Sequence, residues 1–164
     1  MLWFLLGWSC VPEALAQIQE HELKAAFIYN FISFTEWPGK TGTNINICTL
    51  GDDPLNIPLD ALQKKTAKGA AIVVHHLHIG DQVKDCHVIF ISDSERANFP
   101  KILSSLKSTP TLTVTDSEGF AAQGVMIELS LEERRIVFKI NAEAAKEARL
   151  MISSKLLRLA KVVY

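Results

Sequence analysis

The stretch KAAFIYNFISFTEWP, residues 24–38, decides the fold of this chain. Its aromatic and aliphatic residues recur at helical spacing and leave little of the helix surface polar, so the helix must be buried. Residues 17–22 precede it as a polar lead-in. The helix should end near Glu36, because Trp37 stands before Pro38 and the residue before a proline avoids the helical region. The apolar positions are Leu23, Phe27, Ile28, Phe31, Ile32 and Phe34.

Length and composition indicate one globular domain. A chain of 164 residues can bury a core without metals or dense disulfides. Its formal net charge of -1 offers no polybasic surface, so nucleic acid is not an expected partner. No apolar run approaches the roughly 20 residues that are needed to span a bilayer, so we expect a soluble domain.

The beginning of the chain has the features of an export signal. A short apolar run, residues 2–8, is followed by an Ala-Leu-Ala site that ends at Ala16. We therefore expect residues 1–16 to be a signal peptide cleaved after Ala16, and residues 17–164 to form a single periplasmic domain. No Lys or Arg precedes the apolar run, which suggests a start codon further upstream. The alternative interpretation is an apolar first helix of the fold.

Cleavage would leave two cysteines, Cys48 and Cys86, because Cys10 lies in the predicted signal peptide. In an oxidising compartment such a pair is typical of a disulfide. In the simple chain model, closing this loop stabilises the folded state by roughly 3 to 4 kcal/mol. The alternative is a pair of buried thiols that do not meet, which is favoured if the chain is not exported.

Short β-rich runs alternate with helical ones along the rest of the chain. The nearly continuous apolar run CHVIFIS, residues 86–92, is typical of a strand that is covered on both faces. This alternation predicts an α/β fold, a three-layer α/β/α sandwich with a mostly parallel sheet and a C-terminal antiparallel hairpin. The predicted elements are strands at 44–50, 68–78, 86–92 and 111–115, helices at 55–64 and 95–107, a hairpin at 125–131 and 134–140 around a charged turn, Glu132-Glu133, and an amphipathic helix at 142–160 with Asn141 as its N-cap.

No motif in the sequence supports catalysis or a cofactor. Nucleophile elbows, phosphate loops, dinucleotide loops and zincin helices all fail to match, so we expect a protein that is not an enzyme. His75, His76 and His78 fall on one predicted strand. Alternate side chains of a strand face opposite ways, so at most two of these could converge, and we expect no metal site.

Acidic residues follow several of the predicted strands. Asp52, Asp53, Asp93 and Asp116 could therefore gather at the carboxyl edge of the sheet, where open α/β folds bind ligands. This arrangement resembles the acidic pocket of phosphoacceptor receiver domains. The simpler interpretation, that these residues are helix caps and turn formers, is favoured because no lysine follows a fifth parallel strand.

Both ends of the chain resemble the YfiR family. The opening stretch fits KAAFxYNFxxFxEWP, and the closing matches are TVTDSEGFAAQGVMIEL (113–129), RIVFKIN (135–141) and AAKEARLMISSKLLRLAKVV (144–163). The resemblance implies an α/β sandwich, periplasmic residence, no catalytic activity, and a disulfide between Cys48 and Cys86. Some members of the family carry a second cysteine pair toward the C-terminus, which this chain lacks.

YfiR-like proteins are periplasmic repressors of a membrane-bound diguanylate cyclase. The resemblance implies that this chain binds the periplasmic domain of an inner-membrane diguanylate cyclase or sensor kinase and so regulates cyclic-di-GMP signalling and biofilm formation. It also implies an outer-membrane lipoprotein that captures the repressor, and it leaves a homodimer open. A second hypothesis is a periplasmic small-ligand sensor with a pocket at the carboxyl edge of the sheet. Phe34, Trp37, Phe120 and Met126 are candidate contacts for a partner or ligand, with a core position as the alternative for each.

Overall fold

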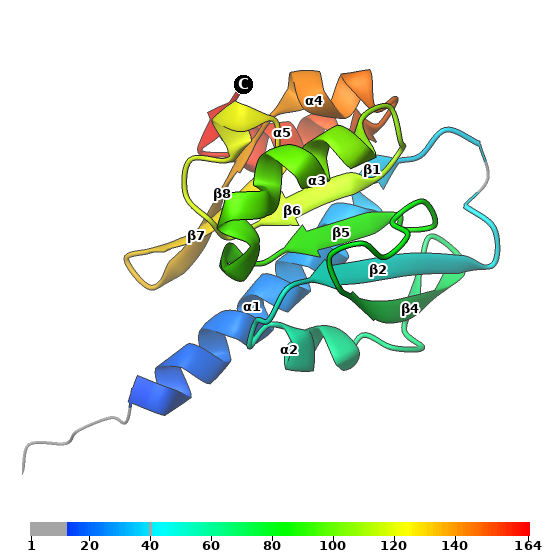
Figure 1. Ribbon diagram of the computed structural model, residues 1–164. Coiled ribbons are helices and arrows are strands. Elements are labelled where there is room, and N and C mark those ends of the chain that lie inside the picture. The colour runs from blue at the N-terminus through cyan, green and yellow to red at the C-terminus, as the bar shows by residue number, and fades with distance from the viewer. Residues whose placement is uncertain (1–12, 40) are drawn as a thin grey trace, which may run out of the picture.

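The computed structural model describes residues 13–39 and 41–164 (Figure 1). Eight strands form one sheet in the order β10-β8-β7-β6-β5-β2-β4-β3, and β1 and β9 form a separate pair. The strands are β1 (Thr35–Glu36), β2 (Asn44–Leu50), β3 (Thr66–Ala67), β4 (Ala70–Leu77), β5 (Val88–Ile91), β6 (Leu112–Thr115), β7 (Ile127–Glu132), β8 (Arg135–Ile140), β9 (Met151–Ile152) and β10 (Val162–Val163). The α-helices are α1 (Glu13–Ser33), α2 (Asn56–Asp60), α3 (Phe99–Leu106), α4 (Ala142–Glu147) and α5 (Ser154–Leu159).

Helices cover both faces of the sheet, which confirms the predicted α/β/α layers (Figure 1). Successive side chains of a strand point to opposite faces. In β2, Ile45 and Ile47 therefore join the core beneath α1, whereas Cys48 and Leu50 join the core beneath α3. The central pairs β4–β2, β2–β5, β5–β6 and β6–β7 are parallel, and the predicted hairpin β7–β8 is antiparallel.

The C-terminal half of α1 is the buried helix that the sequence predicts, because Ile28, Phe31 and Ile32 are almost fully enclosed. Two of its expected boundaries are wrong. The polar lead-in is helical, since α1 begins at Glu13, and the helix ends at Ser33 because the next residues pair with β9 as strand β1. Most of the predicted signal peptide, including Cys10, lies outside the described residues, and its last four residues open α1.

The single helix expected over residues 142–160 is wrong. The chain forms α4 and α5 instead, separated by Arg149 with a φ of 61° and by β9. The apolar residues keep one helical spacing because both short helices bury residues in the same core, which contains Ala145, Ala148 and Leu156. That spacing therefore predicted one long helix. Asn141 caps α4 as expected, accepting a hydrogen bond from the Ala144 backbone, while Ser153 is an N-cap that begins α5.

Four further features differ from the predicted ranges. Helix α2 is shorter than predicted, and the second crossover begins as a 3-10 helix before α3 takes Pro100 into its first turn. Strand β4 starts only at Ala70, because Lys68 and Gly69 form a tight turn with positive φ. The hairpin turn lies at Glu133 and Arg134, both with positive φ, as the favoured two-residue hairpin turn requires. None of the described helices is long and apolar enough to cross a membrane.

Candidate functional site

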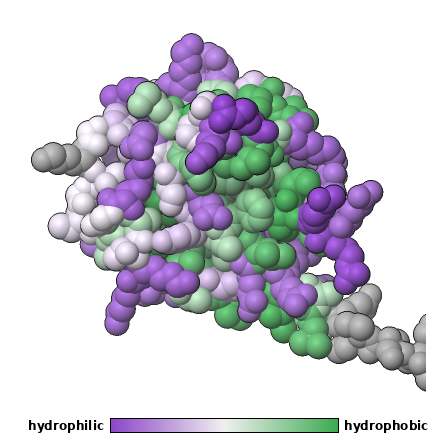
Figure 2. Space-filling model, turned by 180° about the vertical axis from the view of Figure 1, so that it is seen from behind, coloured by the Kyte–Doolittle hydropathy of each residue, from purple (hydrophilic) through white to green (hydrophobic). Residues whose placement is uncertain are grey.

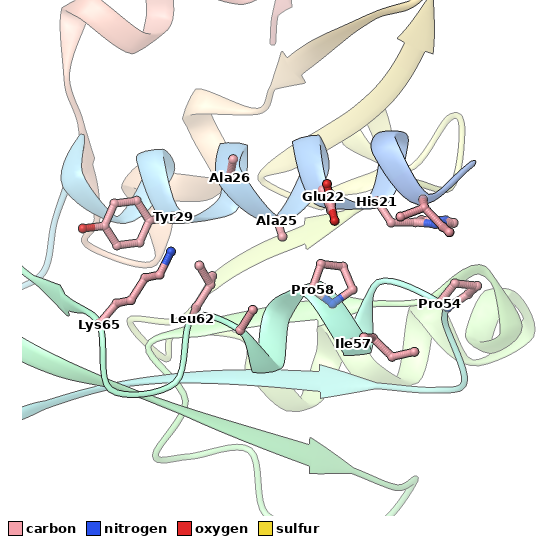
Figure 3. Close-up of a pocket in the computed structure, with 12 residues that line it drawn as sticks. His21, Glu22, Ala25, Ala26, Tyr29, Pro54, Ile57, Pro58, Leu62 and Lys65 are labelled. Carbon is pink, nitrogen blue, oxygen red and sulfur yellow. The ribbon is translucent and has the colours of Figure 1, made fainter. Parts of the chain in front are cut away.

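An apolar groove runs between α1 and the segment that contains α2 (Figure 3). The hollow measures about 520 Å³, and its wall is mainly apolar. Polar residues also border it, with His21 at one end, Glu22 further inward above Pro58, and Lys65 at the other end. The apolar lining comprises Ile18, Ala25, Ala26 and Tyr29 on one side, and Pro54, Ile57, Pro58, Ala61 and Leu62 on the other.

Local sequence explains why this groove is hollow and open. Residues spaced by three or four positions share one face of a helix, so Ile18, Ala25 and Tyr29 line α1 toward the groove. The small side chains of Ala25 and Ala26 leave space in the middle of that face. Leu55 and Leu59 on the α2 segment point into the core, which leaves Ile57 facing outward with 78% of its surface exposed.

Two charged residues beside the groove, Glu22 and Lys65, form no ion pair in the described part of the chain. In contrast, the Tyr29 hydroxyl donates a hydrogen bond of 2.7 Å to the Thr66 carbonyl and fixes the Lys65 end of the groove. The groove thus presents a mainly apolar wall with one carboxylate, Glu22, in its His21 half and one ammonium, Lys65, at the opposite end.

A different face of α1 carries a paired ionic cluster. The Lys24 ammonium lies 2.8 Å from an Asp116 carboxylate oxygen and 2.7 Å from one of Glu20, and Lys24 is only 6% exposed. Burial alone would lower the pKa of Lys24, but the hydrogen bonds to Asp116 and Glu20 outweigh it and raise the pKa. This pairing fixes α1 to the carboxyl end of β6.

The acids that follow the strands bond to nearby residues but are not helix caps, because the N-caps there are Leu55 before α2 and Ser92 before the 3-10 helix. Asp53 accepts hydrogen bonds from the Leu55 amide and the Ser92 hydroxyl, and its pKa is raised by burial, with the Asp116 charge adding to the effect. Ser117 and Arg96 both donate to Asp93, and the two contacts lower its pKa. Asp52 uses its backbone amide to bond Ser94. Within the described ranges, no group of three or more His, Cys, Asp or Glu side chains lies close enough together to hold a metal ion.

The four predicted contact residues do not form one surface. Trp37, Phe120 and Met126 are buried, and Phe34 is half-buried. Phe120 stacks on Phe99 in the core beneath α3, whereas Phe34, Trp37 and Met126 belong to the core beneath α1. Met126 also borders a hollow between α3 and α4. A role for any of the four in partner binding stays a prediction.

Two side-chain links hold the β2 region together. A disulfide joins Cys48 of β2 to Cys86, the pairing that the resemblance implied. The His76 imidazole bridges Thr49 at 2.7 Å and Asp60 at 2.9 Å, so it ties the end of α2 to the sheet. The histidine thus supports one wall of the groove.

Sequence reasoning missed the groove. It treated the helix at residues 24–38 as a core element and assigned no role to Ile57. The available signal was the Ala25-Ala26 pair in an otherwise bulky helix, together with an isoleucine placed beside Pro58. Neither feature predicts a groove until the two segments are known to pack together.

The fold and the groove define an α/β sandwich domain with an open apolar groove on its surface. The chain belongs to the YfiR/HmsC-like family, whose model matches residues 21–161. At the level of the family, this membership supports a non-catalytic periplasmic regulator of cyclic-di-GMP signalling. No curated protein matches the chain closely enough to count as a relative.

Proposed function

We propose that this chain binds the periplasmic sensor domain of an inner-membrane diguanylate cyclase or sensor kinase and holds that protein inactive. The family match over residues 21–161 is the single observation that carries the proposal. The proposal includes export with cleavage after Ala16. Cleavage there would leave the groove intact, because its lining begins at Ile18.

The Cys48–Cys86 disulfide supports a periplasmic location, because disulfides form and persist in oxidising compartments. It closes a loop that contains α2 and β4, and so restrains the segment that forms one wall of the groove. A regulator of this kind needs a stable scaffold with an exposed contact surface and no reacting groups. The disulfide and the groove together meet that need.

To inhibit by binding, the chain must have different affinities for the active and inactive states of its client, the membrane signalling protein. A partner shifts an equilibrium only by as much as it prefers one state over the other. The chain must therefore bind the inactive sensor more tightly than the active one. An outer-membrane lipoprotein that captures the chain would relieve inhibition by lowering the concentration that is free to bind the client.

Affinity capture tests this proposal. Residues 17–164, with the disulfide intact, serve as bait for a detergent extract of the host's own membranes, and a denatured, reduced sample of the same chain is the control. The expected result is recovery of a membrane protein that has a periplasmic sensor domain and a cytoplasmic cyclase or kinase module. Recovery of no such protein at micromolar bait would contradict the proposal.

A second candidate function is a periplasmic small-ligand sensor. One observation favours it, since the groove volume of about 520 Å³ falls within the range of small-molecule pockets. A ligand that binds the folded chain should raise its Tm in the absence of any protein partner. Thermal unfolding with a panel of small amphipathic compounds tests this candidate, and a flat Tm across the panel would count against it.

A further inference from the structure

The groove between α1 and α2 has the shape, the apolar lining and the charge pattern to hold one helix. We propose that it receives an amphipathic helix of the signalling partner, lying along α1 with its N-terminus beside Glu22 and its C-terminus beside Lys65. The inference rests on the proposed function and names the surface through which the partner is held.

Apolar surface extends beyond the hollow. Ile57 is 78% exposed and Ile18 is 55% exposed, one on each side of the groove. Figure 2 shows hydrophobic atoms gathered beside the start of α1 on the rear face of the molecule. Exposed apolar patches that continue past a cavity mark contact with another macromolecule, because a small ligand would leave the outer residues in water.

The walls of the groove favour a helix over an extended segment. Both walls come from helices and a short turn, so they offer no strand edge (Figure 3). An extended segment would bury backbone groups without partners, whereas a helix satisfies its own backbone. From Ile18 to Tyr29 the groove follows about three turns of α1, or roughly 16 Å, which suits anchors at every third or fourth position of a partner helix. The hollow over Ala25 and Ala26 can take one bulky anchor.

The charges near the groove ends set the direction of that helix. Glu22 lies above Pro58, toward the end of the groove that His21 marks, and Lys65 lies at the other end (Figure 3). Neither Glu22 nor Lys65 has an ion-pair partner among the described residues. A helix carries partial positive charge at its N-terminus and partial negative charge at its C-terminus. A partner helix that runs parallel to α1 therefore has the Glu22 carboxylate nearer its N-terminus and the Lys65 ammonium nearer its C-terminus.

A second copy of this chain is a poorer occupant. A symmetric dimer through this surface would place one concave groove against another. The space over Ala25 and Ala26 would then stay unfilled, and unfilled space forfeits the contacts that make such interfaces stable. A convex helix fills the same space.

The first test compares two exposed aliphatic residues, each replaced by Glu. Ile57→Glu changes the groove, and Leu159→Glu is the matched control, because Leu159 on α5 is 68% exposed and lies outside the groove. With the captured partner purified, Ile57→Glu should weaken binding at least about tenfold, as expected for an anchor contact. Leu159→Glu should stay within about twofold, as is usual for contacts outside the anchor cluster. Equal binding by both variants, with unchanged Tm values, would overturn the inference.

The second test uses a photo-crosslinking amino acid at positions 18, 57 and 61 of the full chain bound to the partner, all three of which are exposed and line the groove. Position 57 should label a helical segment of the partner's periplasmic domain. Position 18 should label that helix nearer its N-terminus and position 61 should label it nearer its C-terminus. Labels in a strand or loop, labels in reverse order, or crosslinks between two copies of this chain would each overturn the inference.

The two proposals fail in different ways. If the wild-type chain captures no membrane signalling protein, the proposed function fails and the inference fails with it. If the wild-type chain captures one and Ile57→Glu captures it equally well, only the inference fails. Binding that is lost in Ile57→Glu and kept in Leu159→Glu supports both.

Discussion

Two faces of α1 use charged residues in opposite ways. On one face, Lys24 is buried and pairs with Glu20 and Asp116. Beside the groove, Glu22 and Lys65 have no ion-pair partner among the described residues, and the apolar Ile57 is largely exposed. The ion-paired cluster around Lys24 stabilises the fold. The groove, whose charged neighbours form no ion pair among the described residues, is available to a partner. Changes on the two faces should therefore have separate effects, on stability for the Lys24 cluster and on partner binding for the groove.

The largest expected effect on stability comes from breaking the paired cluster. Lys24→Met leaves Asp116 without its buried partner and should lower the free energy of unfolding by about 3 kcal/mol. Lys65→Met, the matched change beside the groove, should alter it by less than about 0.5 kcal/mol. Urea unfolding of both variants measures the difference. Equal losses of unfolding free energy in the two variants would mean that Lys24 stabilises the fold no more than Lys65 does.

A buried carboxylate elsewhere in the fold makes stability depend on pH. Glu128 is 1% exposed and accepts hydrogen bonds from the Gly119 and Ala121 amides and from Lys139. Burial alone would raise the pKa of Glu128, but the bonds from Ala121, Lys139 and Gly119 outweigh it and hold the pKa below the usual 4.5. The charged form is thus favoured by folding. Its contribution to stability is present above pH 4.5 and is lost as the pH falls through the lowered pKa of the folded state.

Glu128→Gln should therefore cost about 2 kcal/mol of unfolding free energy at pH 7, because Gln replaces a charged acceptor of three hydrogen bonds. The gap between variant and wild type should shrink in acid below the lowered pKa. Lys65→Met, which alters no buried group, should show no such change between the two pH values. Denaturant unfolding at pH 7 and in acid tests both statements, and a gap that widens in acid would contradict them.

The smallest expected effect tests the support of the groove. His76 and Asp60 are both well exposed, so Asp60→Asn should cost only about 0.5 kcal/mol of stability. The same change loosens the link between α2 and the sheet, and partner binding should weaken by about threefold, equivalent to roughly 0.6 kcal/mol. Urea unfolding and a binding titration on one sample separate the two effects. Weaker stability with unchanged binding would show that the link does not shape the groove.

The sequence predicted the layers and most of the strands because buried parallel strands are short, nearly continuous apolar runs. It failed at residues 142–160, where α4 and α5 face the same core and so preserve one helical spacing. The sequence also did not predict the Lys24 cluster or the groove. The Lys24–Asp116 contact joins residues 92 positions apart, and the groove requires α1 to pack beside Pro54 and Ile57. Such contacts depend on tertiary packing, which no local pattern records.

The most direct test of the account is the activity of the captured signalling protein, purified with its periplasmic domain and titrated with this chain. The account predicts that wild type and Leu159→Glu suppress cyclic-di-GMP synthesis, or the kinase reaction, to the same low level at stoichiometric concentration. Ile57→Glu should need at least about ten times more protein, in line with the loss of one anchor contact. Undiminished activity at saturating wild-type chain would contradict the account.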